Sequence, residues 1–62
     1  MTPEAERIAE AGQILKMYGT AAPAFVATRI GALSLTGDQA GIERWRQIAG
    51  RLDALIRAEG MQ

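Results

Sequence analysis

The stretch from Asp38 to Glu59 constrains the fold most, because it carries the clearest apolar stripe in the chain. Apolar residues recur there at steps of three and four, namely Ile42, Trp45, Ala49, Leu52 and Ile56, and the stripe is widened by Ile48 and Leu55. This spacing places them on one face of an α-helix. We therefore predict one long helix over residues 39–59, whose apolar face the rest of the chain must cover.

The start of the chain carries a helix-initiating signal. Thr2 can cap the first turn, and Pro3 fits the first helical position because its missing N–H is not needed there. Gly19 supplies a residue that readily adopts the left-handed conformation in which many helices end. These signals predict a helix over residues 3–18.

A second helix is predicted over residues 23–35, beginning at Pro23 and broken by Thr36-Gly37-Asp38. Asp38 is the expected N-cap of the long helix, where its carboxylate would accept the N–H of Ala40 or Gly41. Both connections are too short to separate domains. Residues 1–62 are thus expected to form a single all-α domain of three helices, the third being the longest.

The helical periodicity also predicts which side chains form the core. The expected core residues are Ile8, Leu15, Val26, Ile30, Leu33, Ile42, Trp45, Ile48, Ala49, Leu52, Leu55 and Ile56. Trp45 has a second interpretation, because tryptophan often anchors a partner protein. Its place inside the long apolar stripe favours the core.

The small size of the chain points towards self-association. A single core in a chain of 62 residues rarely supplies more than about 3–5 kcal/mol. The sequence has no Cys and no His, so disulfides and the usual zinc ligands are not available as supports. Thiol and imidazole chemistry are missing for the same reason, and we expect neither an enzyme nor a cofactor.

The net charge and the hydropathy of the chain narrow the classes of partner that it can bind. Seven acidic and seven basic residues cancel, whereas a nucleic-acid-binding protein normally has a basic excess. The chain opens without the apolar segment of a signal peptide and has no stretch apolar enough to span a membrane. We therefore expect a cytoplasmic protein whose partner is a second copy of itself, as a homodimer, or another protein.

The second predicted helix has no charged side to face the solvent, because Arg29 is its only charged residue. A helix without a charged face is normally covered on both sides. Its small or uncharged outer residues, together with a small-residue row on the long helix, form the predicted self-association interface: Ala24, Ala27, Thr28, Gly31, Ser34, Leu35, Gly50, Ala54 and Ala58. Gly12, Gly31 and Gly50 lie inside helices, where Gly is unfavourable, which suggests close backbone approaches.

Two charged patterns allow other functions. Arg44, Gln47 and Arg51 form a row on the long helix that a helix-turn-helix protein would present to DNA. Zero net charge favours a solvated rim instead, so DNA binding is the alternative interpretation.

Glu6 and Glu10 lie one turn apart, yet no third ligand converges to make a metal or acid–base site, and a solvated helix face is expected.

Arg29 itself has two interpretations. It can clamp an anionic ligand, or it can make a structural ion pair or cap, with Asp38 as a possible partner. The structural role is favoured because an unpaired buried charge is strongly unfavourable.

The run ATRIGALSLTGDQAGIERWRQIAGRLDALI resembles a family of short uncharacterised bacterial proteins. An R-I-G-A-L stretch, a G-D turn and a W-R-x-I-A-x-R-L-D-x-L helix recur there in this order. The resemblance covers roughly residues 23–56 and implies no assigned activity or catalytic residue. It places Arg29, Asp38, Trp45, Arg51 and Asp53 in a recurring pattern, which supports a structural role for the first two.

Overall fold

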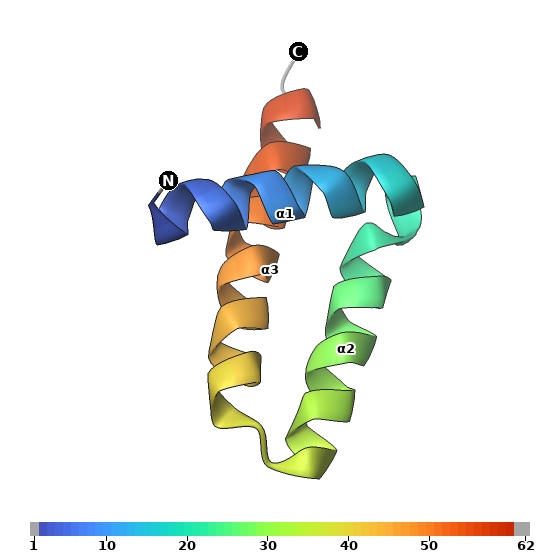
Figure 1. Ribbon diagram of the computed structural model, residues 1–62. Coiled ribbons are helices and arrows are strands. Elements are labelled where there is room, and N and C mark those ends of the chain that lie inside the picture. Colours follow the sequence, from blue (N-terminus) through green and yellow to red (C-terminus); the bar gives the residue numbers. More distant parts are fainter. Residues whose placement is uncertain (1, 61–62) are drawn as a thin grey trace.

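A computed structural model describes residues 2–60, and these residues form helices and turns without a strand (Figure 1). The elements are α1 (Pro3–Tyr18), a 3₁₀ turn η1 (Gly19–Ala21), α2 (Ala22–Thr36) and α3 (Gln39–Gly60). The all-α prediction is confirmed. The predicted helix bounds of 3–18, 23–35 and 39–59 agree with the observed ones to within one residue.

The ends of α1 follow from local signals. The Thr2 hydroxyl oxygen accepts a hydrogen bond from the backbone N–H of Ala5 at 3.1 Å, and Pro3 lies in the first turn. Gly19 ends the helix with a positive φ of 56°, and its N–H donates to the carbonyl oxygen of Leu15. The residue types at both ends therefore do what the sequence predicts.

The connection between α1 and α2 is a 3₁₀ turn rather than a loop that ends in a side-chain cap. The chain makes a 3₁₀ turn over Gly19–Ala21, and α2 begins at Ala22 without a side-chain cap. Pro23 lies in the first turn of the helix, as predicted.

The turn between α2 and α3 is fixed by backbone and side-chain hydrogen bonds. Gly37 takes a left-handed conformation (φ 73°, ψ 19°) and donates to Ser34, and Asp38 donates to Leu33 at 3.1 Å. This pair of bonds is the Schellman ending of a helix. The Asp38 carboxylate then accepts the N–H of Gly41 at 2.9 Å, which caps α3. One residue thus closes α2 and starts α3.

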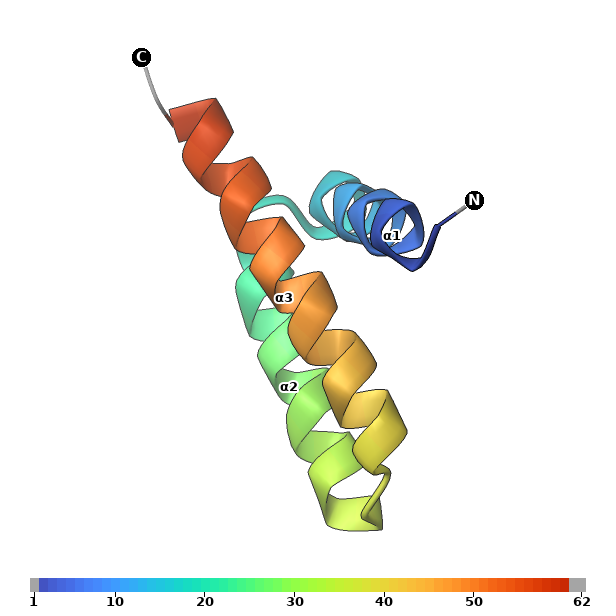
Figure 2. The same ribbon diagram turned by 90° about the vertical axis from the view of Figure 1, so that its left-hand side faces the viewer.

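The helices do not form a bundle with near-parallel axes. In both views α2 and α3 run side by side as an antiparallel hairpin, and α1 lies across the C-terminal half of α3 (Figures 1 and 2). Helix α1 packs mainly on α3 and touches α2 much less. Because α1 lies across only one face of the hairpin, the rest of that face and the opposite face are left without a covering helix (Figure 2).

The core is small and lies where the three elements meet. Its buried members are Ala11, Ile14, Ala22, Val26, Ile42, Ile48 and Leu52. Of the predicted core residues, a further seven are half-buried: Leu15, Ile30, Leu33, Trp45, Ala49, Leu55 and Ile56.

Ile8 departs from the predicted core, because 44% of its surface is exposed. A helix that crosses another touches it over only a short central patch. In α1 this patch falls on Ala11 and Ile14, which are 0% and 8% exposed. Ile8 lies nearer the N-terminus, where the long side chains of Glu4 and Arg7 make the contacts with α3.

Candidate interaction surfaces

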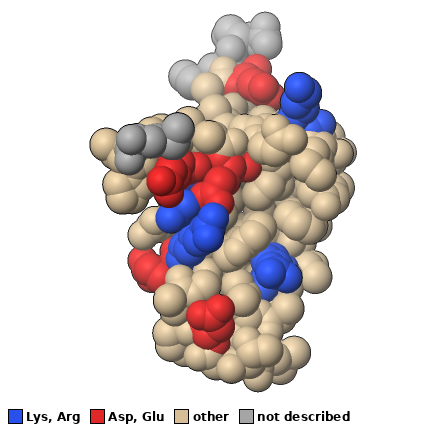
Figure 3. Space-filling view, viewed as in Figure 1, with Lys and Arg blue, Asp and Glu red and all other residues tan. Residues whose placement is uncertain are grey.

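The row of α3 that was predicted to contact DNA consists of Arg44, Gln47 and Arg51, and it faces α1. All three side chains are bonded to side chains of α1. Arg44 forms a salt bridge with Glu10, and Arg51 forms one with Glu4. The amide oxygen of Gln47 accepts a hydrogen bond from Arg7 Nε at 3.3 Å. Figure 3 shows the acidic and basic side chains gathered where α1 meets α3. The row therefore joins two helices of the same chain.

Glu10 is the centre of this network. Its two carboxylate oxygens accept from different arginines, one from Arg7 and the other from Arg44. Partial burial raises the pKa of Glu10, but the hydrogen bonds and positive charges of Arg44 and Arg7 outweigh that effect and hold the pKa below its ordinary value. Glu10 is thus kept ionised by two neighbouring cations, an arrangement suited to fixing α1 on α3.

Metal binding by Glu6 and Glu10 gains no support from this geometry. The described residues contain no group of three or more side chains arranged to hold a metal ion. A carboxylate that two guanidinium groups hold in its ionised form is also a weak proton acceptor. Among the described helices, none is long and apolar enough to cross a membrane.

Arg29 and Asp38 do not form the predicted ion pair. The salt bridges within residues 2–60 join Arg7 and Arg44 to Glu10, Arg51 to Glu4 and Arg57 to Asp53. The Asp38 carboxylate is engaged in capping α3, whereas the Arg29 guanidinium lies 5.8 Å from the centre of the Trp45 ring. The cap expected of Asp38 is present, and Arg29 makes a cation–π contact instead of a salt bridge.

Trp45 is half-buried at the edge of the core, within an aromatic cluster. The Phe25 ring meets it edge-on, with centroids 5.9 Å apart, and stacks on the Tyr18 ring at 4.2 Å. Each of these three rings comes from a different helix. Such contacts contribute about 0.5–1.5 kcal/mol beyond area burial, so Trp45 combines a packing role with an accessible surface.

The predicted self-association residues all lie on the surface. They comprise six positions on α2 and three on α3: Ala24, Ala27, Thr28, Gly31, Ser34, Leu35, Gly50, Ala54 and Ala58. Leu35 is 91% exposed. A Cβ atom added at Gly12, Gly31 or Gly50 would meet no atom within 4 Å, so these glycines make no close backbone approach inside the chain.

A groove between α2 and α3 adjoins these residues. It has a volume of about 190 Å³, and its lining residues are Pro23, Val26, Ala27, Ile30, Ala49, Leu52, Asp53 and Ile56. A second groove of about 650 Å³ shares Pro23 and Ile56 and continues between α1 and the C-terminal part of α3, past Leu15 and Leu55. The uncharged side of α2 is therefore bordered by an apolar depression.

Residues 4–60 match a family described as a family of unknown function (DUF6961). The chain belongs to this family. The match extends beyond the region of the sequence resemblance and takes in nearly all of α1. No curated protein and no solved structure matches the chain.

Sequence reasoning missed two features of this family member. The first is the role of Arg7, which contacts both Glu10 on its own helix and Gln47 on α3. Its i,i+3 spacing from Glu10 is a visible signal for the first contact, but nothing local predicts the second. The second is the aromatic cluster, because Tyr18 and Phe25 come together only through the turn between α1 and α2.

Proposed function

We propose that this protein is a small non-enzymatic interaction protein, a single three-helix unit that self-associates as a homodimer through α2. The contact surface, called the α2 surface below, consists of Ala24, Ala27, Thr28, Gly31, Ser34 and Leu35. The observation that carries the proposal is that this whole side of α2 is exposed and uncharged. A helix face of this composition is normally covered.

The groove between α2 and α3 strengthens the case, because Ala27 belongs both to its lining and to the α2 surface. Val26 and Leu52, each 2% exposed, lie beneath it, and half-buried Ile30 and Ile56 border it. A protruding side chain of a second copy has an apolar place to enter there. Leu35, at 91% exposure, is a side chain of the chain's own surface that projects in this way.

Small residues favour a close helix–helix contact. Nothing lies within 4 Å of the space that a Gly31 side chain would occupy, so a helix of the partner copy can approach the α2 backbone there. A stable dimer buries about 800 Å² on each partner. The α2 surface and the adjoining groove offer a continuous area on two helices from which such an interface can be built.

The distribution of charge also favours an interface on the α2 side of the molecule. Much of the charge lies over α1 and the neighbouring part of α3 (Figure 3), whereas the residues of the α2 surface carry none. Self-association through α2 leaves the charged side in water. It also adds buried apolar area to a small core, in which seven of the described residues are buried.

The DNA-binding alternative has less support. Arg44, Gln47 and Arg51 would have to leave Glu10, Arg7 and Glu4 in order to reach phosphates or bases. Acidic side chains next to such a row also repel a polyanion. The proposal includes the cytoplasmic bacterial setting that the sequence analysis predicts.

Gly31→Glu tests the interface by placing a carboxylate at the centre of the α2 surface. The space around Gly31 is open, so the monomer should keep its helical circular dichroism spectrum. We expect wild-type protein at micromolar concentration to sediment as a dimer and the variant as a monomer. A carboxylate buried in an apolar contact is strongly unfavourable.

Ala5→Glu is the matched control, because Ala5 is an exposed residue that lies between Glu4 and Glu6 on α1 rather than on α2. It adds the same charge and should leave the dimer intact. Ala54→Glu asks separately whether the row of Gly50, Ala54 and Ala58 joins the interface. A wild-type protein that sediments only as a monomer, or a Gly31→Glu variant of unchanged mass, would reject the α2 interface.

A further inference from the structure

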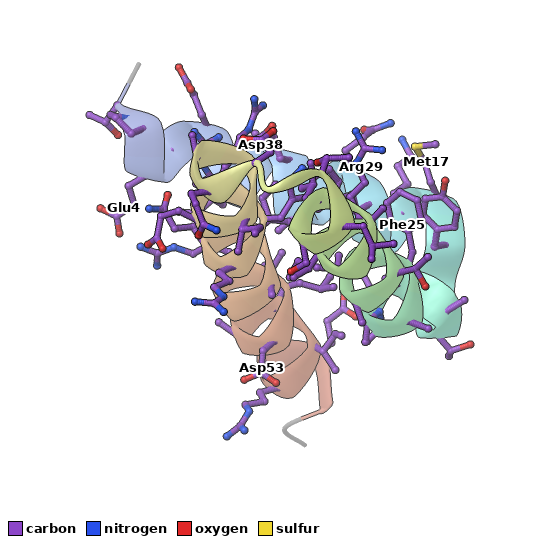
Figure 4. All side chains as sticks on the ribbon, turned by 90° about the horizontal axis from the view of Figure 1, so that it is seen from below. Glu4, Met17, Phe25, Arg29, Asp38 and Asp53 are labelled. Carbon is purple, nitrogen blue, oxygen red and sulfur yellow. The ribbon has the colours of Figure 1, made fainter. Side chains whose placement is uncertain are left out.

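A second surface lies where α1 crosses the hairpin, on the side of α2 turned towards α1. We name it the aromatic corner and define it by Tyr18, Phe25, Arg29 and Trp45. The rings form a continuous series, because Phe25 stacks on Tyr18 and meets Trp45 edge-on. Met17, Phe25 and Arg29 lie on the same side of the molecule (Figure 4).

Arg29 is held in place but has no anionic partner within residues 2–60. Its guanidinium lies over the Trp45 ring, 5.8 Å from the centroid, which fixes the side chain through a cation–π contact. Neither a salt bridge nor a hydrogen bond from Arg29 occurs among the described side chains. The N–H groups of Arg29 thus remain available for a planar anion such as a carboxylate.

Apolar surface surrounds this cation. Met17 is 63% exposed and Tyr18 is 39% exposed. On its other side, Trp45 borders an open groove of about 400 Å³ whose floor includes Ile14 and Ile48. Glu10 also lines that groove, but both its oxygens are already engaged by Arg7 and Arg44. The charge left unmatched beside the corner is therefore positive.

We propose that the aromatic corner docks a segment of a partner protein in which Asp or Glu lies beside a large apolar side chain. The carboxylate would pair with Arg29, and the apolar side chain would pack on Phe25, Trp45 and the neighbouring groove. Arg29 is the charged residue of the aromatic corner, and one guanidinium group suits one carboxylate, whereas a nucleic acid requires several basic groups in a row. An open surface suits a polypeptide better than a small molecule, which binds in an enclosing cavity.

This proposal does not depend on self-association. Arg29 and the α2 surface lie on different sides of α2, since Gly31 is two residues further along the helix and two residues turn it by about 200°. A partner segment at the aromatic corner and a second copy at the α2 surface can therefore bind at once.

The first experiment selects peptides from a displayed random library on immobilised full-length protein and, in parallel, on the Arg29→Gln variant. We expect wild type to enrich peptides with Asp or Glu next to Leu, Ile, Phe or Trp, and the variant to lose that enrichment. No enrichment on wild type, enrichment of basic peptides, or equal enrichment on Arg29→Gln would overturn the proposal.

The second experiment titrates the most enriched peptide and follows the fluorescence of Trp45, the only tryptophan in the chain. The emission should change on binding, and Arg29→Gln should weaken affinity by about tenfold or more, because it removes a charge-assisted pair. Replacing the peptide's acid by its amide should weaken binding to wild type equally. An amide peptide that binds as tightly as the acid would contradict the pairing.

Two controls separate this surface from the α2 surface. Gly31→Glu should bind the peptide with unchanged affinity, whatever its effect on dimerisation. Arg29→Gln should keep the sedimentation behaviour of wild type. If Arg29→Gln instead changes the oligomeric state, the aromatic corner belongs to the contact between copies, and the proposal of a separate partner is wrong.

Discussion

The start of α3 allows a quantitative test, because the capping residue and a glycine compete for the same space. The Asp38 carboxylate accepts the N–H of Gly41 at 2.9 Å. A Cβ atom added at Gly41 would lie 2.6 Å from Asp38 Oδ2, which is too close for two unbonded heavy atoms. Gly41→Ala therefore forces the carboxylate to move away and to give up the cap.

Opposing effects of similar size decide the outcome. Replacing Gly by Ala inside a helix stabilises by about 0.8–1.0 kcal/mol, and losing an N-cap costs about 1 kcal/mol. We expect Gly41→Ala to leave the free energy of unfolding nearly unchanged in wild type. In an Asp38→Ala background, where no cap remains to be lost, the same substitution should stabilise by the full amount.

Wild type, Gly41→Ala, Asp38→Ala and the double variant form a double-mutant cycle, in which we expect a coupling free energy of about 1 kcal/mol. The free energy of unfolding is measured by urea denaturation at one protein concentration, since self-association would make the apparent stability depend on concentration. Asp38→Ala alone should lower the midpoint of thermal unfolding by about 4–8 °C for a domain of this size.

Gly12→Ala provides the matched control, because Gly12 lies inside α1 and its added Cβ would meet nothing within 4 Å. It should stabilise equally with and without Asp38. If Gly41→Ala stabilises wild type by about 1 kcal/mol and shows no coupling to Asp38, the steric conflict at the cap does not exist and the reasoning fails.

Two further predictions concern pH and the core. The pKa of Glu10 is lowered in the folded protein from an ordinary value of 4.5, so the stability that its ionised form contributes is present above that value. This contribution is lost as the pH falls through the folded pKa, and Glu10→Gln should flatten stability–pH curves below pH 4.5. Ile48→Ala, at a residue 1% exposed, should destabilise by about 2–5 kcal/mol and nearly unfold the chain by circular dichroism. Ile8→Ala, at 44% exposure, should have a much smaller effect, and equal losses would contradict the assigned core.

The sequence by itself determined where the helices begin and end. The residues at the helix ends act on the backbone within a few positions of themselves, so their effects can be predicted without knowledge of the fold. They are Thr2, Gly19, Gly37 and Asp38. The long stripe of α3 is equally local information. Its residues Ile42, Ile48 and Leu52 are buried in the structure.

Only the tertiary structure decided how the helices cross and which charges meet. The position of α1 across α3 leaves Ile8 exposed and brings Glu10 to Arg44, although the two lie 34 residues apart. It also leaves Arg29 beside Trp45 without the carboxylate expected for it. Crossing geometry depends on side-chain packing between distant segments, whereas helix periodicity and capping depend on neighbours in the chain.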